Sequence, residues 1–129
     1  MIEGLRKGLP LFLWTFLIFF GSSLPPAQAS DNGLIDFAVH KLAHLLEYGI
    51  LYLLYYKSVV GNIWEKRPDK IFQALLFVAV FGAADEYHQS FVPGRSPRVA
   101  DVIIDFLGGL SGLFVWWSLR RLAQKKQKN

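Results

Sequence analysis

The chain of 129 residues contains no cysteine, which excludes disulfide bonds, thiolate metal ligands and a cysteine nucleophile. Charged residues are also scarce, at 19% of the sequence against roughly 25% in soluble domains. A glycine-rich phosphate loop, a serine-nucleophile motif and a dinucleotide-binding fingerprint are all missing. No stretch shows the apolar–polar alternation of barrel strands, so helices are the remaining way to satisfy the backbone in lipid.

Hydrophobic residues, by contrast, make up 53% of the chain, and they are gathered into four blocks. This pattern predicts an all-α fold, an integral membrane bundle of four transmembrane helices at about residues 9–24, 40–60, 69–90 and 99–120. A span needs about 20 helical residues, so each block crosses only with its polar ends in the interface or inside the bundle. Residues 1–129 are expected to form one domain.

The basic residues behind the net charge of +4 are unevenly distributed. They gather near the N-terminus, between the second and third blocks, and in the last ten residues, RRLAQKKQKN. The positive-inside rule then predicts a multi-pass protein of the inner membrane with both termini in the cytoplasm. Residues 40–48 and 85–105 would lie together on the extracytoplasmic side, where Arg95 and Arg98 are expected to be paired. Nucleic-acid binding is not expected, because the basic residues form a tail rather than a face with stacking aromatics.

The first block has a second interpretation. Arg6-Lys7, the apolar run and Ala27-Gln28-Ala29 before Ser30 resemble a secretory signal peptide with a small-residue cleavage site. We favour a retained helix, because the apolar run extends to Leu24 and is long for a signal peptide. Cleavage would leave three helices without changing the topology downstream.

The second block carries polar residues at its outer end. On a helix, His40, His44 and Glu47 fall at i, i+4 and i+7, and Lys41, His44 and Tyr48 form an overlapping stripe. One interpretation is a ligand site lined by imidazole and carboxylate groups. The other is an interfacial helix start whose side chains reach towards lipid headgroups. His44 and Glu47 favour the first, because an unpaired carboxylate in a membrane costs several kcal/mol.

The third block ends in Asp85-Glu86-Tyr87-His88-Gln89. Asp85 and Gln89 share a helix face at i, i+4, whereas Glu86 points elsewhere. The following residues, from Val92 to Arg95, have the Pro-then-Gly order of a type II turn. This turn would bring Arg95 back towards the carboxylates, to pair with Asp85 or Glu86, to bind an anionic ligand, or both.

The fourth block opens with Asp101, Asp105, Gly108 and Gly112 at i, i+4, i+7 and i+11, a single stripe. The two glycines form the small-xxx-small pattern that lets membrane helices approach closely. The stripe therefore turns both aspartates towards a neighbouring helix. Asp105 is then a candidate base, a metal ligand, or a partner of Lys41 or Arg95.

The sequence gives little support for a metal site. Oxygen and nitrogen ligands are available, but HExxH and Glu-x-x-His are missing and HxxxH alone is a weak signal. No metal or cofactor is assigned. The candidate ligand residues are His44, Glu47, Asp85, Glu86, His88, Asp101 and Asp105.

Taken together, these residues resemble the VanZ-like family of small bacterial membrane proteins. The pattern is Ser22-Ser23-Leu24-Pro25, Lys41-x-x-His44-x-x-Glu47-Tyr48, Asp85-Glu86-x-His88-Gln89-x-Phe91-x-Pro93-Gly94-Arg95 and Asp101-x-x-x-Asp105-x-x-Gly108-x-x-x-Gly112. The resemblance implies four membrane helices with the first one retained, a link to the cell envelope, and an association with glycopeptide (teicoplanin) resistance. Two departures stand out: His40 lies where the family often has Asp, and Asp105 where it often has Asn.

We therefore expect an extracytoplasmic polar cluster that binds a lipid-linked envelope precursor or an amphiphilic, glycopeptide-type antibiotic, with membrane lipids as partners and the oligomeric state open. A membrane-embedded hydrolase or transferase acting on a lipid-linked phosphate or sugar, and a structural or assembly protein, remain alternatives. Asp85, Glu86 and His44 are the candidate catalytic residues. The candidate ligand-binding residues are Lys41, Glu47, Tyr48, His88, Gln89, Arg95, Asp101 and Asp105.

Overall fold

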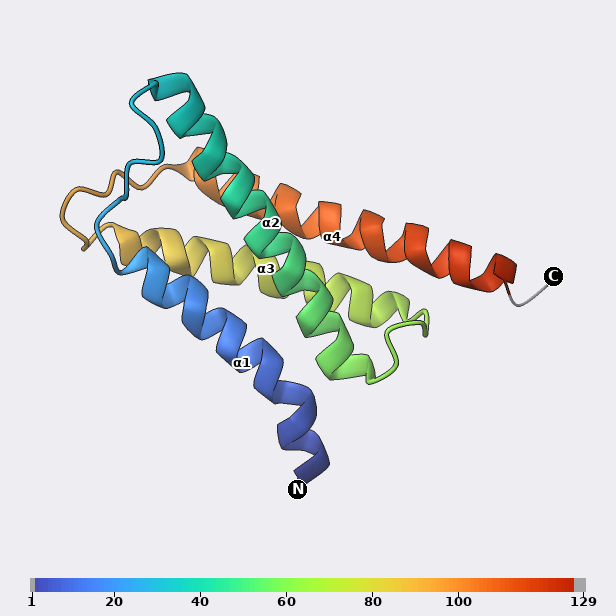
Figure 1. Cartoon of the computed structure of the whole chain (residues 1–129). Coiled ribbons are helices and arrows are strands. Elements are labelled where there is room, and N and C mark those ends of the chain that lie inside the picture. Colours follow the sequence, from blue (N-terminus) through green and yellow to red (C-terminus); the bar gives the residue numbers. More distant parts are fainter. Residues whose placement is uncertain (1, 127–129) are drawn as a thin grey trace.

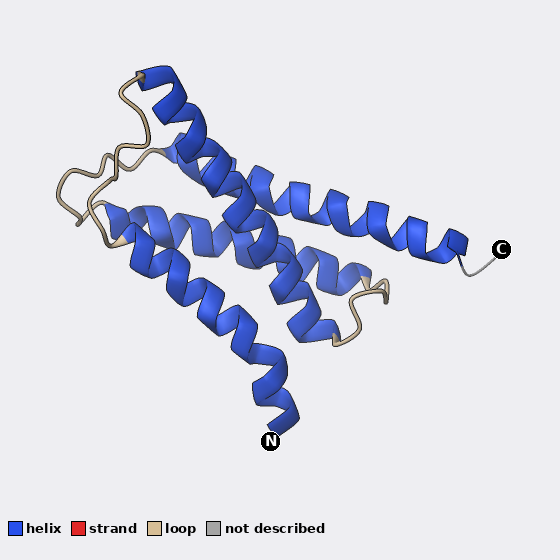
Figure 2. Cartoon of the chain, viewed as in Figure 1, coloured by secondary structure: helices blue, strands red, loops and turns tan. Residues whose placement is uncertain are grey.

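The computed structural model describes residues 2–126, which form four α-helices and, within that range, no strand (Figures 1 and 2). The all-α expectation is confirmed. Two helices begin earlier than the apolar blocks indicated, α1 at Ile2 and α2 at Gly33. The bounds are α1 Ile2–Ser22, α2 Gly33–Val60, α3 Pro68–Gln89 and α4 Val99–Lys126.

Local sequence explains where the helices begin and end. Asn32 caps α2, because its side-chain oxygen accepts the N–H groups of Leu34 at 3.0 Å and Ile35 at 3.4 Å. α2 ends at Val60, and Gly61 follows with a φ of +80°, a positive value that glycine adopts more readily than other residues. Pro68 occupies the first turn of α3, where its missing N–H is not needed.

The turn between α3 and α4 has the predicted geometry. Arg95 N–H donates to the carbonyl of Val92 at 3.1 Å, and Gly94 has a φ of +82°. These are the hydrogen bond and the positive φ of a type II turn. The turn lies beside the segment that joins α1 to α2, so both outer connections are at one end of the molecule (Figure 1).

Aromatic side chains dominate the core. Tyr48, Tyr52 and Tyr56 of α2 are fully buried, and Trp116 of α4 packs against Tyr56 with ring centroids 5.0 Å apart. The Tyr56 hydroxyl donates to the carbonyl of Glu65 at 2.6 Å. Tyrosine suits this position because its ring packs in the core while its hydroxyl reaches the α2–α3 connection.

Glycine allows α4 to lie directly against α2. A Cβ atom at Gly112 would be 2.4 Å from the carbonyl oxygen of Gly49, and one at Gly108 would be 2.7 Å from that of Leu45. Neither position has room for a side chain. The small-xxx-small interpretation is confirmed, and the same stripe turns Asp105 inward, where it is fully buried.

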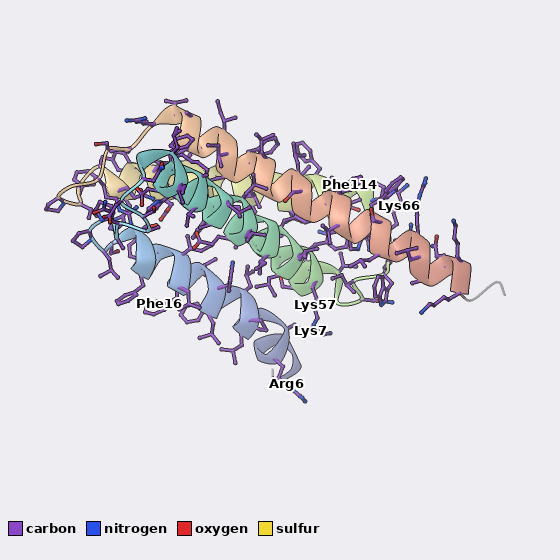
Figure 3. The ribbon with its side chains drawn as sticks, turned by 45° about the horizontal axis from the view of Figure 1, so that its top comes forward. Arg6, Lys7, Phe16, Lys57, Lys66 and Phe114 are labelled. Carbon is purple, nitrogen blue, oxygen red and sulfur yellow. The ribbon has the colours of Figure 1, made fainter. Side chains whose placement is uncertain are left out.

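Large apolar side chains remain exposed on all four helices. On α1, Phe12 is 65% exposed, and the side chains of Phe16 on α1 and Phe114 on α4 point away from the bundle (Figure 3). Within residues 2–126, α4 is the helix long and apolar enough to cross a membrane, with a mean hydropathy of 1.7 in its most apolar stretch. Charged residues interrupt or flank the apolar parts of the other three.

Candidate functional site

Several of the polar residues singled out from the sequence lie beside the α1–α2 and α3–α4 connections. Figure 1 shows that these two connections share one end of the bundle. Contacts between distant parts of the chain hold this end together. The Arg98 N–H donates to Glu86 Oε2 at 3.1 Å, which ties the start of α4 to the end of α3. His44 of α2 and Asp105 of α4 are 2.8 Å apart. The predicted convergence of these segments is therefore observed.

Two polar pairs join α2 to α4. Lys41 Nζ donates to Asp101 Oδ1, and His44 Nδ1 bonds to Asp105 Oδ1 at 2.8 Å. Both aspartates come from the glycine stripe that packs on α2, so close helix packing and ion pairing share one interface. Of the partners considered for Asp105, neither Lys41 nor Arg95 is the one observed. Lys41 is paired with Asp101, and Asp105 is hydrogen-bonded to His44.

A second set of hydrogen bonds joins α1 to α3. Asp85 Oδ2 accepts the Ser22 hydroxyl at 2.7 Å and the Gln89 amide at 2.9 Å. Ser23 Oγ lies 2.9 Å from Nε2 of His88. The candidate list omitted both serines, although the Ser22-Ser23-Leu24-Pro25 element of the resemblance pointed to them.

Arg95 is held differently from either salt bridge considered. Its Nε donates to the carbonyl of Leu24 and its Nη2 to that of Gly21, each at 3.1 Å. The Gly21 carbonyl is in the last turn of α1, where it also accepts the Leu24 N–H at 3.2 Å, and the Leu24 carbonyl lies just beyond the helix. Among the described residues, no carboxylate lies within ion-pair distance of the Arg95 or Arg98 side chain. The expectation that these arginines are paired with carboxylates is wrong.

A cavity of about 410 Å³ opens beside these contacts. Four of the expected ligand-binding residues, Lys41, Gln89, Arg95 and Asp101, line it together with the candidate catalytic residue His44. His40, which belonged to the stripe considered as a ligand site, lines it too, and sequence reasoning had not placed three others in a ligand site, namely Asp36, Phe37 and Arg98. Asp36 could have been found from its helical spacing with His40 and His44, had the early start of α2 been recognised.

The remaining candidates lie behind the cavity wall. Tyr48 and Asp105 are fully buried, and Asp85 and Glu86 are 3% and 5% exposed. None of these four lines the cavity, nor do Glu47 and His88. The sequence interpretation is corrected for Tyr48: its side chain is buried in the core and does not face the cavity.

Several buried oxygens have no hydrogen-bond partner among the described residues: Asp85 Oδ1, Glu86 Oε1, Asp105 Oδ2 and the hydroxyls of Tyr48 and Tyr52. A buried polar atom without a partner costs about 1–3 kcal/mol. Gly82 packs closely against one of these oxygens, because a Cβ atom there would lie 3.2 Å from Asp105 Oδ2. The carboxylates thus hold their neighbours with one oxygen each and keep the second in the interior.

The geometry offers anion binding more readily than metal binding. No three histidine, aspartate or glutamate side chains in the described part of the chain are grouped so as to hold a metal ion. The cavity wall instead presents the guanidinium groups of Arg95 and Arg98, beside Asp36 and the ion pair of Lys41 with Asp101. Lysine and arginine are the usual protein contacts for phosphate and carboxylate groups.

A family model described as VanZ/LLP1 matches residues 8–121. This chain belongs to the VanZ/LLP1 family. The match includes most of α1, all of α2 and α3, and α4 as far as Arg121, and so contains every residue of the cluster. Neither a comparison with curated proteins nor one with solved structures gave a match.

Proposed function

We propose that this VanZ/LLP1 protein spans the cytoplasmic membrane four times. In this proposal the cavity lies at the extracytoplasmic end and binds the anionic headgroup of an amphiphile. A lipid-linked envelope precursor or a glycopeptide-type antibiotic is the proposed ligand. Anion binding by the cavity is the central claim, and the membrane topology gives the site its access to such ligands.

Membrane insertion is supported by the apolar surface. Leu34 is 82% exposed, Phe72 68% and Phe114 66%, and they come from three different helices. A soluble monomer rarely exposes apolar surface this widely, whereas lipid covers it at no cost. The orientation rests on charge, because the N-terminal, α2–α3 and C-terminal segments are rich in lysine and arginine.

One observation carries the proposal of anion binding: Arg95 and Arg98 line the cavity without a carboxylate partner among the described residues. Arg98 is exposed and Arg95 half-buried, so their N–H groups can reach the oxygens of an anion in the cavity, which guanidinium groups bind in pairs. Arg95 is fixed by two carbonyls, which leaves Nη1 for a ligand. Arg98 has its whole guanidinium available, because its two hydrogen bonds use the backbone N–H and carbonyl.

The surroundings of the cavity suit an amphiphile rather than a free anion. Phe37 lines it and is 57% exposed, and nearby Phe91 and Val99 are 69% and 79% exposed. A headgroup bound at the arginines would leave its hydrocarbon chain beside these side chains. Burial of that chain adds about 0.8 kcal/mol for each methylene removed from water.

The test is binding of a polyprenyl phosphate to the purified protein in nanodiscs, with phosphatidylcholine as the background lipid. Arg98→Gln should weaken binding about tenfold, the usual effect of removing one charged contact. Arg121→Gln removes the same charge at the other end of α4 and should leave the affinity unchanged. Equal affinity of wild type and Arg98→Gln, or equal losses in both variants, would show that the cavity is not the site.

The His44–Asp105 pair favours a second candidate function, hydrolysis or transfer at a lipid-linked phosphate. Asp105 occupies Nδ1 of His44, so Nε2 is the nitrogen available to a ligand, and His44 lines the cavity. A carboxylate that orients a histidine in this way is a common arrangement for a general base. The test is turnover of polyprenyl diphosphate by the purified protein, lost in His44→Gln while ligand binding persists. If the wild-type protein binds polyprenyl diphosphate without turning it over, the protein is a binding protein and this second function is wrong.

A further inference from the structure

A second cavity lies at the opposite end of the bundle, between the start of α1 and the end of α2. Its volume is about 300 Å³, and it is lined by Arg6, Lys7, Pro10, Leu54, Lys57 and Gly61. Figure 3 shows Arg6 and Lys7 on α1 and Lys57 on α2 at this end. Three cations and two apolar side chains thus surround one space.

The three cations are brought together although their charges repel. Two of them, Arg6 and Lys57, have no carboxylate of the described residues within ion-pair distance. Acidic residues are available at this end, but they serve the α2–α3 connection. Arg67 lies 3.8 Å from Glu65 and 3.3 Å from Asp69, and Lys70 lies 4.0 Å from Asp69. Arg6 and Lys57 therefore bring to the cavity two positive charges that no carboxylate of the described residues pairs.

Gly61 keeps one wall of the cavity free of a side chain. Its φ of +80° disfavours any other residue, and a Cβ atom there would lie 3.8 Å from Nζ of Lys7. The chain therefore turns away from α2 without narrowing the space beside Lys7. Pro10 and Leu54 supply the apolar side.

We infer that this cavity binds the phosphate of an anionic phospholipid, with the phosphate at Arg6, Lys7 and Lys57 and the start of the acyl chain against Pro10 and Leu54. Basic pockets between membrane helices on the cytoplasmic side suit such headgroups. A lipid is favoured over free phosphate because the apolar surface continues from the cavity along α1, where Leu9 and Leu13 are 54% and 50% exposed. The inference rests on the proposed membrane insertion but is independent of the cavity at the other end.

The test is thermal stabilisation of the detergent-solubilised protein by phosphatidylglycerol, measured beside phosphatidylcholine and inorganic phosphate. Wild type should be stabilised by phosphatidylglycerol alone. Combined Arg6→Gln and Lys57→Gln should raise the half-maximal lipid concentration about tenfold or more, since each basic residue contributes about 1 kcal/mol. Combined Lys125→Gln and Lys126→Gln removes the same charge at the end of α4 and should respond like wild type.

Two outcomes would overturn the inference. Equal weakening in both double variants would show a general surface-charge effect, and equal stabilisation by inorganic phosphate would show a site for free phosphate.

If the first double variant does not fold, Arg6→Lys with Lys57→Arg keeps the charge and should retain phosphatidylglycerol selectivity. Loss of that selectivity would equally contradict a site held by charge. Polyprenyl phosphate binding at the other end should be the same in all of these variants, so failure of this inference is distinguishable from failure of the proposed function.

Discussion

Asp85 illustrates how single residues hold this bundle together. It is 3% exposed and accepts hydrogen bonds from the side chains of Ser22 on α1 and Gln89 on α3. One carboxylate therefore satisfies two donors from two helices. Such a residue is expected to affect stability before it affects ligand binding, because it does not line the cavity.

Asp85→Ala should lower the free energy of unfolding in detergent by about 1–3 kcal/mol, since it removes the acceptor of the Ser22 hydroxyl and leaves the Gln89 amide only its 3.4 Å hydrogen bond to Ser22 Oγ. Thermal unfolding followed by circular dichroism measures this loss. Asp69→Ala is the control, because that carboxylate is at the surface near Arg67 and should matter little. Equal unfolding temperatures for Asp85→Ala and wild type would mean that these hydrogen bonds do not hold α1 on α3.

At the scale of elements, the contact of α2 with α4 determines the site. The glycine stripe sets how close these helices lie, and this distance allows Lys41 to reach Asp101 and His44 to reach Asp105. A change on the stripe should therefore disturb packing and binding together.

Gly112→Ala should destabilise the protein by about 1–3 kcal/mol, because its Cβ would be 2.4 Å from the carbonyl oxygen of Gly49. It should also weaken polyprenyl phosphate binding, as the separated helices carry Lys41 and Asp101 apart. Gly8→Ala is a matched control: nothing lies within 4 Å of its added Cβ, so helix propensity alone should stabilise α1 slightly. An unchanged Gly112→Ala protein would show that α2 and α4 are not in close contact.

The contacts of α1 bear on whether it is retained. Beyond the Ser22 and Ser23 hydrogen bonds, Trp14 Nε1 donates to the carbonyl of Glu47 at 3.0 Å, and Arg95 is held by carbonyls of Gly21 and Leu24. Cleavage after Ala29 would remove all of these partners. We therefore expect the intact mass of protein purified from membranes to include α1. A mass beginning at Ser30 would contradict that expectation.

How much the sequence predicts varies along these elements. Periodicity and glycine spacing were enough for the α4 stripe and the buried Asp105, and the Pro-Gly order was enough for the turn at Gly94. The partner of Arg95 could not be predicted, because it binds main-chain carbonyls whose position depends on how α1 ends against α3. Likewise, the role of Asp36 at the cavity depends on α2 extending past its apolar block to the cap at Asn32.

At the scale of the whole molecule, the absence of cysteine makes the proposed topology directly measurable. A single cysteine at Ser96, an exposed residue of the α3–α4 connection, should react with a membrane-impermeant maleimide in intact cells. A cysteine at the exposed Gln124 of α4 should react only after permeabilisation. The reverse pattern would invert the orientation. Labelling of both in intact cells would rule out the proposed placement of the two ends.

The two cavities lie at opposite ends of the bundle, and each is lined by cationic side chains. In the proposed orientation, the inner cavity anchors the bundle to an abundant anionic lipid and the outer cavity takes a rarer amphiphile. The two sites use opposite ends of α2. The start of α1 completes the inner one, whereas the outer one also needs the α3–α4 connection. Each should therefore be removable by mutation without loss of the other.

The most direct measurement for the outer site is photocrosslinking of the membrane-inserted protein with a polyprenyl phosphate that carries the reactive group next to its phosphate. Crosslinked peptides should come from both residues 33–44 and residues 89–101, two segments that are distant in sequence and meet at the cavity. The yield should fall in Arg98→Gln and not in Arg121→Gln. Crosslinks confined to the helix surfaces midway along the bundle, with equal yields in both variants, would contradict an anion-binding cavity at this end.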